Sequence, residues 1–69
     1  MTFSEKIKEA RRQLGLSQEK FAAKIGVSFS TINRWEKGHF LPSYLAQAQF
    51  EAFCKENGIV FDTDTGDGQ

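Results

Sequence analysis

The feature that most constrains the fold is a very short link between two short helical segments, at residues 18–25 and 28–37. Each segment lies at or just after a serine that can act as an N-cap, and each is followed by a glycine that can end it. The apolar face of the first segment contains Phe21, Ala22 and Ile25. Because only about two residues separate the segments, the two helices must pack at a steep angle.

Further helices are predicted on both sides of this pair. Residues 2–5 fit a capping box, with Thr2 as the cap and Glu5 reaching back to it. The helical stripe that follows contains Phe3, Ile7, Ala10 and Leu14. Ser43 can cap a fourth helix that ends at residues 57–58. The sequence therefore predicts an all-α domain in which the steep pair is a helix-turn-helix motif.

The chain has 69 residues, which is enough for one domain but close to the lower limit for a self-sufficient core. Small domains often gain stability from disulfides, a metal or oligomerisation. Cys54 is the only cysteine and His39 the only histidine, so neither an internal disulfide nor a zinc site is expected. Cys54 is expected to be buried packing, and no catalytic constellation, cofactor or enzyme activity is predicted. Oligomerisation is left as the leading route to stability.

Targeting signals are not evident in the sequence. No run of about 18 apolar residues occurs, so no membrane span is predicted. The N-terminal residues lack the apolar region of a signal peptide. Together with the lone thiol, this favours a cytoplasmic location.

Charge is distributed unevenly along a chain whose net charge is zero. Residues 1–41 contain eight Lys and Arg against four Glu, and residues 42–69 contain one Lys against five Asp and Glu. A basic half joined to an acidic half indicates a polyanionic partner at one end. A mixed solvated surface with an acidic tail explains the charges equally well. Residues 62–69 contain no apolar side chain and are expected to be a disordered tail.

The chain resembles the Cro and phage-repressor-like family of helix-turn-helix domains, also called the xenobiotic-response-element (XRE) family. The matching residues are Leu16, Ser17, Gln18, Glu19, Ala22, Ile25, Gly26, Val27, Ser28, Ile32, Trp35, Glu36, Lys37, Gly38, Pro42 and Ser43. The resemblance covers roughly residues 5–56. It implies a compact lambda-repressor-like domain, usually of five helices, whose third helix enters the major groove of double-stranded DNA.

The end of the chain departs from that family pattern. Only residues 59–69 follow the fourth helix, and they do not have the pattern of a fifth one. Ile59, Val60 and Phe61 predict either a short strand or an extended apolar anchor. We therefore expect a helix-turn-helix domain of four to five helices at 1–58, followed by an apolar segment and a flexible acidic tail at 59–69.

The helix at 28–37 has one polar face. At about 100° per residue, Ile32 and Trp35 fall on one side of this helix. The opposite side holds Ser30, Asn33, Arg34 and Lys37. Arginine pairs bidentately with guanine and asparagine with adenine in the major groove. An ordinary solvated face is the simpler interpretation, but within a helix pair of this spacing we favour DNA reading.

Four further residues are assigned to the DNA-binding set. Phe29 could join the core or pack on a thymine methyl, and the family's use of the matching position favours base contact. Thr31 could reach a phosphate or pack between helices, and Ser28 begins the same helix. The resemblance implies that Gln18 holds a phosphate at the start of the preceding helix, the alternative being an exposed helix-start residue.

Glu36 falls toward the core side of the same helix, where a carboxylate needs a partner. The resemblance implies that Arg11 pairs with it and so fixes the recognition helix. Arg11 could instead contact a phosphate, or do both.

The fourth helix carries two apolar stripes. One contains Leu45, Ala48 and Ala52, and the other contains Ala46, Phe50, Phe53 and Cys54. Either the core wraps both sides, or the second stripe forms a dimer surface. The dimer interpretation gives a homodimer built from Phe50, Phe53, Ile59, Val60 and Phe61, in which the last three could pair with their symmetry mates as a short strand.

The expected function is sequence-specific binding of double-stranded DNA by a transcriptional regulator, a repressor in particular. Its operator should be near-palindromic, since a symmetric dimer reads two half-sites. The main alternative is an antitoxin-type interaction module that binds a protein partner and binds DNA secondarily. A restriction-modification controller is a third and narrower alternative.

Overall fold

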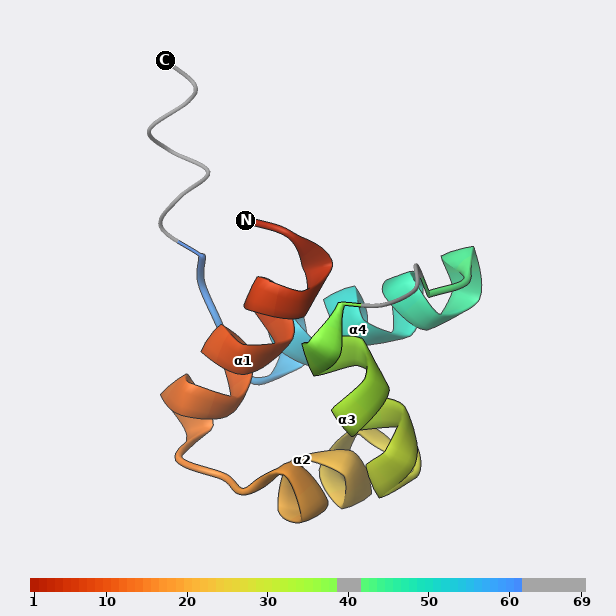
Figure 1. The fold of residues 1–69 in the computed structure, drawn as a ribbon. Helices are drawn as coiled ribbons and strands as arrows, with labels where there is room; N and C mark the ends of the chain where they lie inside the picture. The colour runs from red at the N-terminus through yellow and green to blue at the C-terminus, as the bar shows by residue number, and fades with distance from the viewer. Residues whose placement is uncertain (39–41, 62–69) are drawn as a thin grey trace.

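The computed structural model describes residues 1–38 and 42–61. They form four α-helices, α1 (Phe3–Leu14), α2 (Gln18–Ile25), α3 (Phe29–Lys37) and α4 (Tyr44–Glu56), drawn in Figure 1. No strand occurs within these residues. The all-α prediction is confirmed, with four helices in the described part of the chain. None of these helices is long and apolar enough to span a bilayer.

The helix ends follow the predicted capping residues. The side chains that accept a hydrogen bond from the first turn belong to Thr2, Ser17, Ser28 and Ser43. The capping box at α1 is complete, because Glu5 also accepts from the backbone N–H of Thr2 at 2.9 Å. Local sequence alone thus determines where each helix begins.

Gly26 makes the short link possible. Its φ of 93° lies in the left-handed region, which residues other than glycine rarely adopt. In this conformation the N–H groups of Gly26 and Val27 both donate to the carbonyl of Ala22. The chain therefore reverses direction within Gly26, Val27 and Ser28, and α3 begins immediately afterwards.

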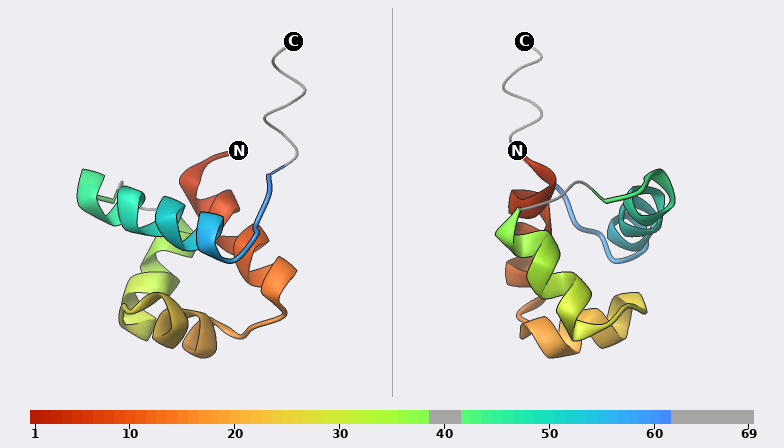
Figure 2. Two further views of the ribbon diagram at one scale, coloured as in Figure 1. Left: turned by 180° about the vertical axis from the view of Figure 1, so that it is seen from behind. Right: turned by 45° about the vertical axis from the view of Figure 1, so that its right-hand side comes forward.

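The arrangement places α3 between α1 and α2. These are the helix pairs with the most extensive contacts, and α2 and α3 cross at a steep angle at the bottom of Figure 1. The α4 helix runs across the side of the molecule that faces away from the viewer in Figure 1. It therefore lies in front in the left view of Figure 2. As a result, one side of α3 is packed and the other faces outward.

Every helix contributes to the core. Its buried apolar members are Ile7, Ala10, Phe21, Ala22, Ile25, Ile32, Trp35, Phe50, Phe53, Cys54 and Ile59. Aromatic rings link the helices edge to face: the Phe3 ring of α1 lies 5.3 Å from that of Trp35 in α3 and 5.4 Å from that of Phe50 in α4. Such contacts add to the stabilisation from burial alone.

The two apolar stripes of α4 require a correction. Phe50 and Phe53 are only 2% and 8% exposed, so they belong to the chain's own core and offer no dimer surface in this fold. Tyr44 and Leu45, at 82% and 78% exposed, point away from the core, and Ala48 and Ala52 are exposed with them. The physical reason is size, because burying a phenyl ring removes far more apolar surface from water than burying a methyl group.

The segment after α4 also packs differently from the prediction. Ile59 is buried in the core and Phe61 lies against the ring of Phe50, so these two do not form an outward surface either. Val60 is exposed, and Gln13 of α1 brackets its backbone, donating to its carbonyl at 2.7 Å and accepting from its N–H at 3.4 Å. The packed chain thus continues to Phe61, as an extended anchor and not as a strand. The expected tail at 62–69 lies outside the described residues, as does His39.

Candidate nucleic-acid interface

The outward face of α3 gathers the residues predicted to read DNA. Phe29, Ser30, Asn33, Arg34 and Lys37 together line a shallow depression on this face. On the packed side of α3, the buried residues are Ile32, Trp35 and Glu36. The helix is therefore divided into a buried half and a polar half, as the helical periodicity predicted.

Phe29 lies at the first turn of α3 and is 46% exposed. It is absent from the buried cluster, which leaves its ring accessible beside Ser30 and Asn33. An apolar group from outside, such as the methyl of a thymine, can therefore reach the ring.

Ser28 and Thr31 use their hydroxyl groups locally. The Ser28 Oγ accepts from the backbone N–H of Thr31 at 3.2 Å, and the two hydroxyls are 2.9 Å apart in a further hydrogen bond. These contacts hold the first turn of α3. Neither residue lines the depression formed by the other five.

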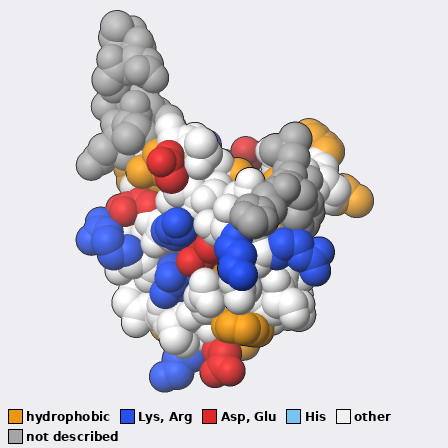
Figure 3. Space-filling view, in the orientation of Figure 1, with side chains coloured by type: hydrophobic (Ala, Val, Ile, Leu, Met, Phe, Trp, Pro, Cys, Tyr) orange, Lys and Arg blue, Asp and Glu red, His pale blue; other side chains and the backbone are white. Residues whose placement is uncertain are grey.

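The electrostatic surroundings suit a polyanion. Lys and Arg side chains spread over the face that carries α1 and α3, with fewer acidic side chains among them (Figure 3). On α3 itself, both Arg34 and Lys37 lie in the last turn. Glu36, the only acidic residue of that helix, is buried and paired, so it contributes little negative charge to the outer surface.

The predicted ion pair between Arg11 and Glu36 is present behind this face. Arg11 Nε donates to Glu36 Oε2 at 2.8 Å, and Arg11 Nη2 donates to Oε1 at 3.1 Å. Arg11 Nη1 also donates to the carbonyl of Leu16 at 3.2 Å. The fork therefore links α1, the loop before α2, and α3, which fixes how α3 sits on the domain.

Gln18 takes part in the same network. Its Nε2 donates to Glu36 Oε1 at 3.0 Å, so its side chain is directed toward α3. Burial raises the pKa of Glu36, but the hydrogen bonds from Arg11 and Gln18 outweigh it, and the pKa is lowered overall. Because a buried carboxylate can accept several hydrogen bonds, the sequence already indicated that Glu36 could take a second donor besides Arg11. The backbone N–H groups at the start of α2 are available to bind a phosphate there.

Sequence reasoning missed two polar residues that support the helix pair from other helices. Ser4 Oγ of α1 donates to the carbonyl of Glu36 at 3.0 Å, and Gln49 Nε2 of α4 donates to the carbonyl of Ile25 at 3.0 Å. Both acceptors lie in the last turn of a helix, where carbonyls lack intrahelical partners. Because the donors are 32 and 24 residues away, no local signal in the sequence could reveal them.

Two short helices joined through a glycine turn, with a cationic and polar face on the second, define a helix-turn-helix DNA-binding domain. A family model described as "Helix-turn-helix" matches residues 7–45. An uncharacterized HTH-type transcriptional regulator of Methanothermobacter thermautotrophicus is 46% identical over 39 residues, which are 56% of this chain and 56% of that protein. The uncharacterized HTH-type transcriptional regulator YgzD of Bacillus subtilis is 45% identical over 57 residues, 81% of this chain and 86% of YgzD. No solved structure matches significantly.

The chain therefore belongs to the helix-turn-helix family of the Cro/C1 type. This is a family of DNA-binding transcriptional regulators and not of enzymes. The resemblance drawn from the sequence is confirmed at the level of the family and of the fold.

Proposed function

We propose that the protein represses transcription by binding a near-palindromic operator as a homodimer, with α3 in the major groove. The observation that carries this proposal is the outward face of α3, where Asn33, Arg34 and Lys37 lie together beside the exposed ring of Phe29. A regulator that occupies such a site within a promoter excludes the transcription machinery from the same DNA.

The residues of this face have different roles in the proposal. Arg34 and Asn33 read base edges, a guanine and an adenine respectively, because their side chains match the hydrogen-bonding patterns of those bases. Lys37, at the end of the helix, neutralises a phosphate and adds affinity without sequence preference. Phe29 packs on a thymine methyl. Ser30 adds a hydroxyl that can bond to either a base or a phosphate.

Dimerisation follows from the amount of DNA that one helix can read. A single recognition helix contacts only a few base pairs, which selects poorly against the competing sites of a genome. The exposed apolar stripe of α4, Tyr44 and Leu45 with Ala48 and Ala52, replaces the buried phenylalanines as the proposed dimer surface. Exposed apolar side chains grouped on one helix face are typical of such contacts.

Selection of operators from a random DNA library tests the reading of DNA and its symmetry together. We expect enrichment of two inverted half-sites about 10 base pairs apart, or a multiple of that spacing. Transcription in vitro from a promoter that overlaps the selected site should fall when the protein is added. Enrichment of a single half-site, or increased transcription, would contradict the dimer or the repressor role.

Sedimentation equilibrium with and without operator DNA tests the dimer surface. Leu45→Asp should shift the protein toward monomer, whereas Val60→Asp, an equally polar change at an exposed apolar residue, should leave the dimer intact. If Val60→Asp produced monomer and Leu45→Asp did not, the dimer interface would be formed by the C-terminal segment. A parent protein that stays monomeric on DNA would assign the α4 stripe to a different protein partner.

A further inference from the structure

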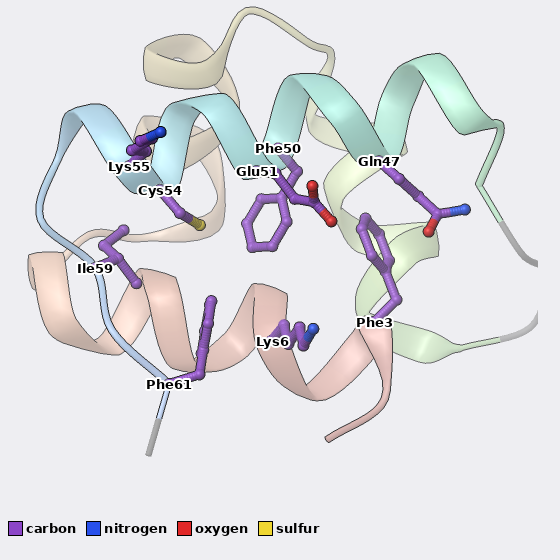
Figure 4. A pocket seen from close by; sticks show the side chains of 9 residues that line it. All are labelled: Phe3, Lys6, Gln47, Phe50, Glu51, Cys54, Lys55, Ile59 and Phe61. Carbon is purple, nitrogen blue, oxygen red and sulfur yellow. The ribbon is translucent and has the colours of Figure 1, made fainter. Parts of the chain in front are cut away.

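A cavity of about 540 Å³ lies between α1, α4 and the segment that ends at Phe61, away from the outward face of α3. Figure 4 shows side chains of α1 and Phe61 pointing toward those of α4 across this space. Pockets that hold small organic molecules typically measure about 300–1,000 Å³. The cavity is therefore large enough for a ligand of that kind, and the DNA-binding proposal makes no use of it.

The wall of the cavity has an apolar part and a polar part. The rings of Phe3, Phe50 and Phe61 and the side chain of Ile59 form the apolar part, and Gln47 adds a polar side chain. Cys54 adds its thiol, and burial raises the pKa of this group to about 11, so it remains protonated and neutral at physiological pH. A ligand that fills the space must bring an apolar body of its own.

The rim carries an excess of positive charge. Lys6 and Lys55 line the opening with a single carboxylate, Glu51. Within the described residues neither lysine forms an ion pair, and the Lys6 ammonium lies 5.7 Å from the centre of the Phe61 ring. An anionic group at the opening would give these lysines the ion-pair partner that they lack within those residues.

The inner wall contacts the recognition helix directly. Phe3 lines the cavity, and its ring packs edge to face on Trp35 of α3 at 5.3 Å between centroids. Ser4, the next residue, donates a hydrogen bond to the carbonyl of Glu36. A molecule that displaces Phe3 therefore acts on α3 through one ring contact.

We propose that this cavity binds a small amphipathic anion, a carboxylate on an apolar chain or ring, and that its occupancy alters DNA binding through Phe3 and Trp35. The second half of this statement rests on the proposed function, whereas the first half does not. The carboxylate lies at the rim beside Lys6 and Lys55, and the apolar body lies among the aromatic rings.

The chain's single tryptophan makes binding directly measurable, because Trp35 contacts the cavity wall. Sodium octanoate, titrated below its micellar range, should change Trp35 fluorescence saturably and bind one molecule per chain by calorimetry. Octanol and octylamine, which have the same chain without the negative charge, should bind at least tenfold more weakly. Lys6→Gln should weaken octanoate binding about fivefold, which is the scale of a partly exposed ion pair.

Lys24→Gln is the matched control, since Lys24 is exposed on α2 and does not line the cavity. Its affinity for octanoate should equal that of the parent. Equal binding of the three probes, an equal effect of both substitutions, or no saturable signal would overturn the proposed site. If octanoate instead dissociated a dimer in sedimentation, the cavity would belong to a second copy of the chain.

The link to DNA is tested with the same probe. Saturating octanoate should change the affinity of the parent for its selected operator at least threefold and have a smaller effect on Lys6→Gln. Octanoate binding with unchanged operator affinity would overturn the link. Absence of operator binding both with and without octanoate would instead count against the proposed function, and fluorescence would still report on the cavity.

Discussion

The α3 and α4 helices both carry apolar residues, but they differ in how those residues are distributed. In α3 the buried side chains, Glu36 among them, fall on one side and the exposed polar ones on the other, so the outward face could be identified from the sequence. In α4 apolar residues surround the axis, and the structure buries the stripe with Phe50 and Phe53 while exposing that with Tyr44 and Leu45. Periodicity therefore identifies a face only when a helix has one apolar stripe.

Where two stripes compete, the area that each can bury decides between them. Burial is favourable by about 25 cal/mol per Å² of apolar surface, so two phenylalanine rings gain more than a leucine with two alanines. Residue size was available in the sequence and would have favoured Phe50 and Phe53 for the core.

The largest expected effect tests this assignment of the α4 stripes. Phe50→Ala should destabilise the domain by about 3–5 kcal/mol, since it leaves a cavity where Phe3 and Phe61 now pack. In the monomeric protein, at concentrations too low for dimerisation, Leu45→Ala at a 78% exposed position should alter the free energy of unfolding by about 0.5 kcal/mol or less. Urea denaturation followed by circular dichroism measures both. Similar losses in the two variants would show that α4 is packed on both sides.

An intermediate effect is expected at the ion pair behind α3. Glu36→Ala should destabilise the fold by about 2 kcal/mol, because Arg11 and Gln18 lose a charged hydrogen-bond acceptor in a partly buried place. Thermal unfolding of the variant and the parent provides the comparison. A midpoint equal to that of the parent would mean that the pair does not hold α3 on the domain.

The same pair predicts a specific acid dependence. Since the pKa of Glu36 is lower in the folded protein than in the unfolded chain, its stabilisation is present above the unfolded value of about 4.3. It is lost as the pH falls through the folded value. Glu36→Gln should therefore flatten the decline in stability of the parent below about pH 5.

Glu9 supplies the control for this titration. Arg12 and Gln13 lower its pKa to about 2, yet this ion pair lies at the protein surface, where Arg12 is largely exposed and water screens the charges. Glu9→Gln should leave the acid profile close to that of the parent. If Glu9→Gln altered the acid profile and Glu36→Gln did not, the acid dependence would belong to Glu9 and not to Glu36.

Prediction from the sequence succeeded where the cause is local. Where the cause is distant it failed, apart from the Arg11–Glu36 pair that the family resemblance implied. Thr2, Ser17, Ser28 and Ser43 cap helices because each lies next to the N–H groups that it satisfies. The hydrogen bonds from Ser4, Gln13 and Gln49 depend on how the helices pack, and no pattern in the neighbouring sequence predicts them.

The candidate site followed the same division. Asn33, Arg34 and Lys37 were placed correctly on one face by helical geometry. Gln18 was predicted to turn outward to a phosphate, but the buried carboxylate of Glu36 competes for its amide. This tertiary contact orients the Gln18 side chain, and its phosphate contact stays a prediction.

The smallest expected effect concerns the acidic residues beyond the described chain. Removing residues 62–69 deletes three Asp residues that repel DNA phosphates, so operator affinity should be equal or slightly higher. The comparison is best made at low salt, where screening is weakest. A large loss of affinity would give this segment a role in binding.

The most direct test of DNA reading by α3 compares Arg34→Ala with Lys37→Ala on the selected operator and on its single-base variants, across a range of salt concentrations. Arg34→Ala should lose about 1–3 kcal/mol of binding free energy and tolerate substitutions at one base position. Lys37→Ala should weaken binding to all sequences alike and reduce the salt slope by about 1. If Arg34→Ala kept both the affinity and the sequence preference of the parent, the outward face of α3 would not be the surface that reads DNA.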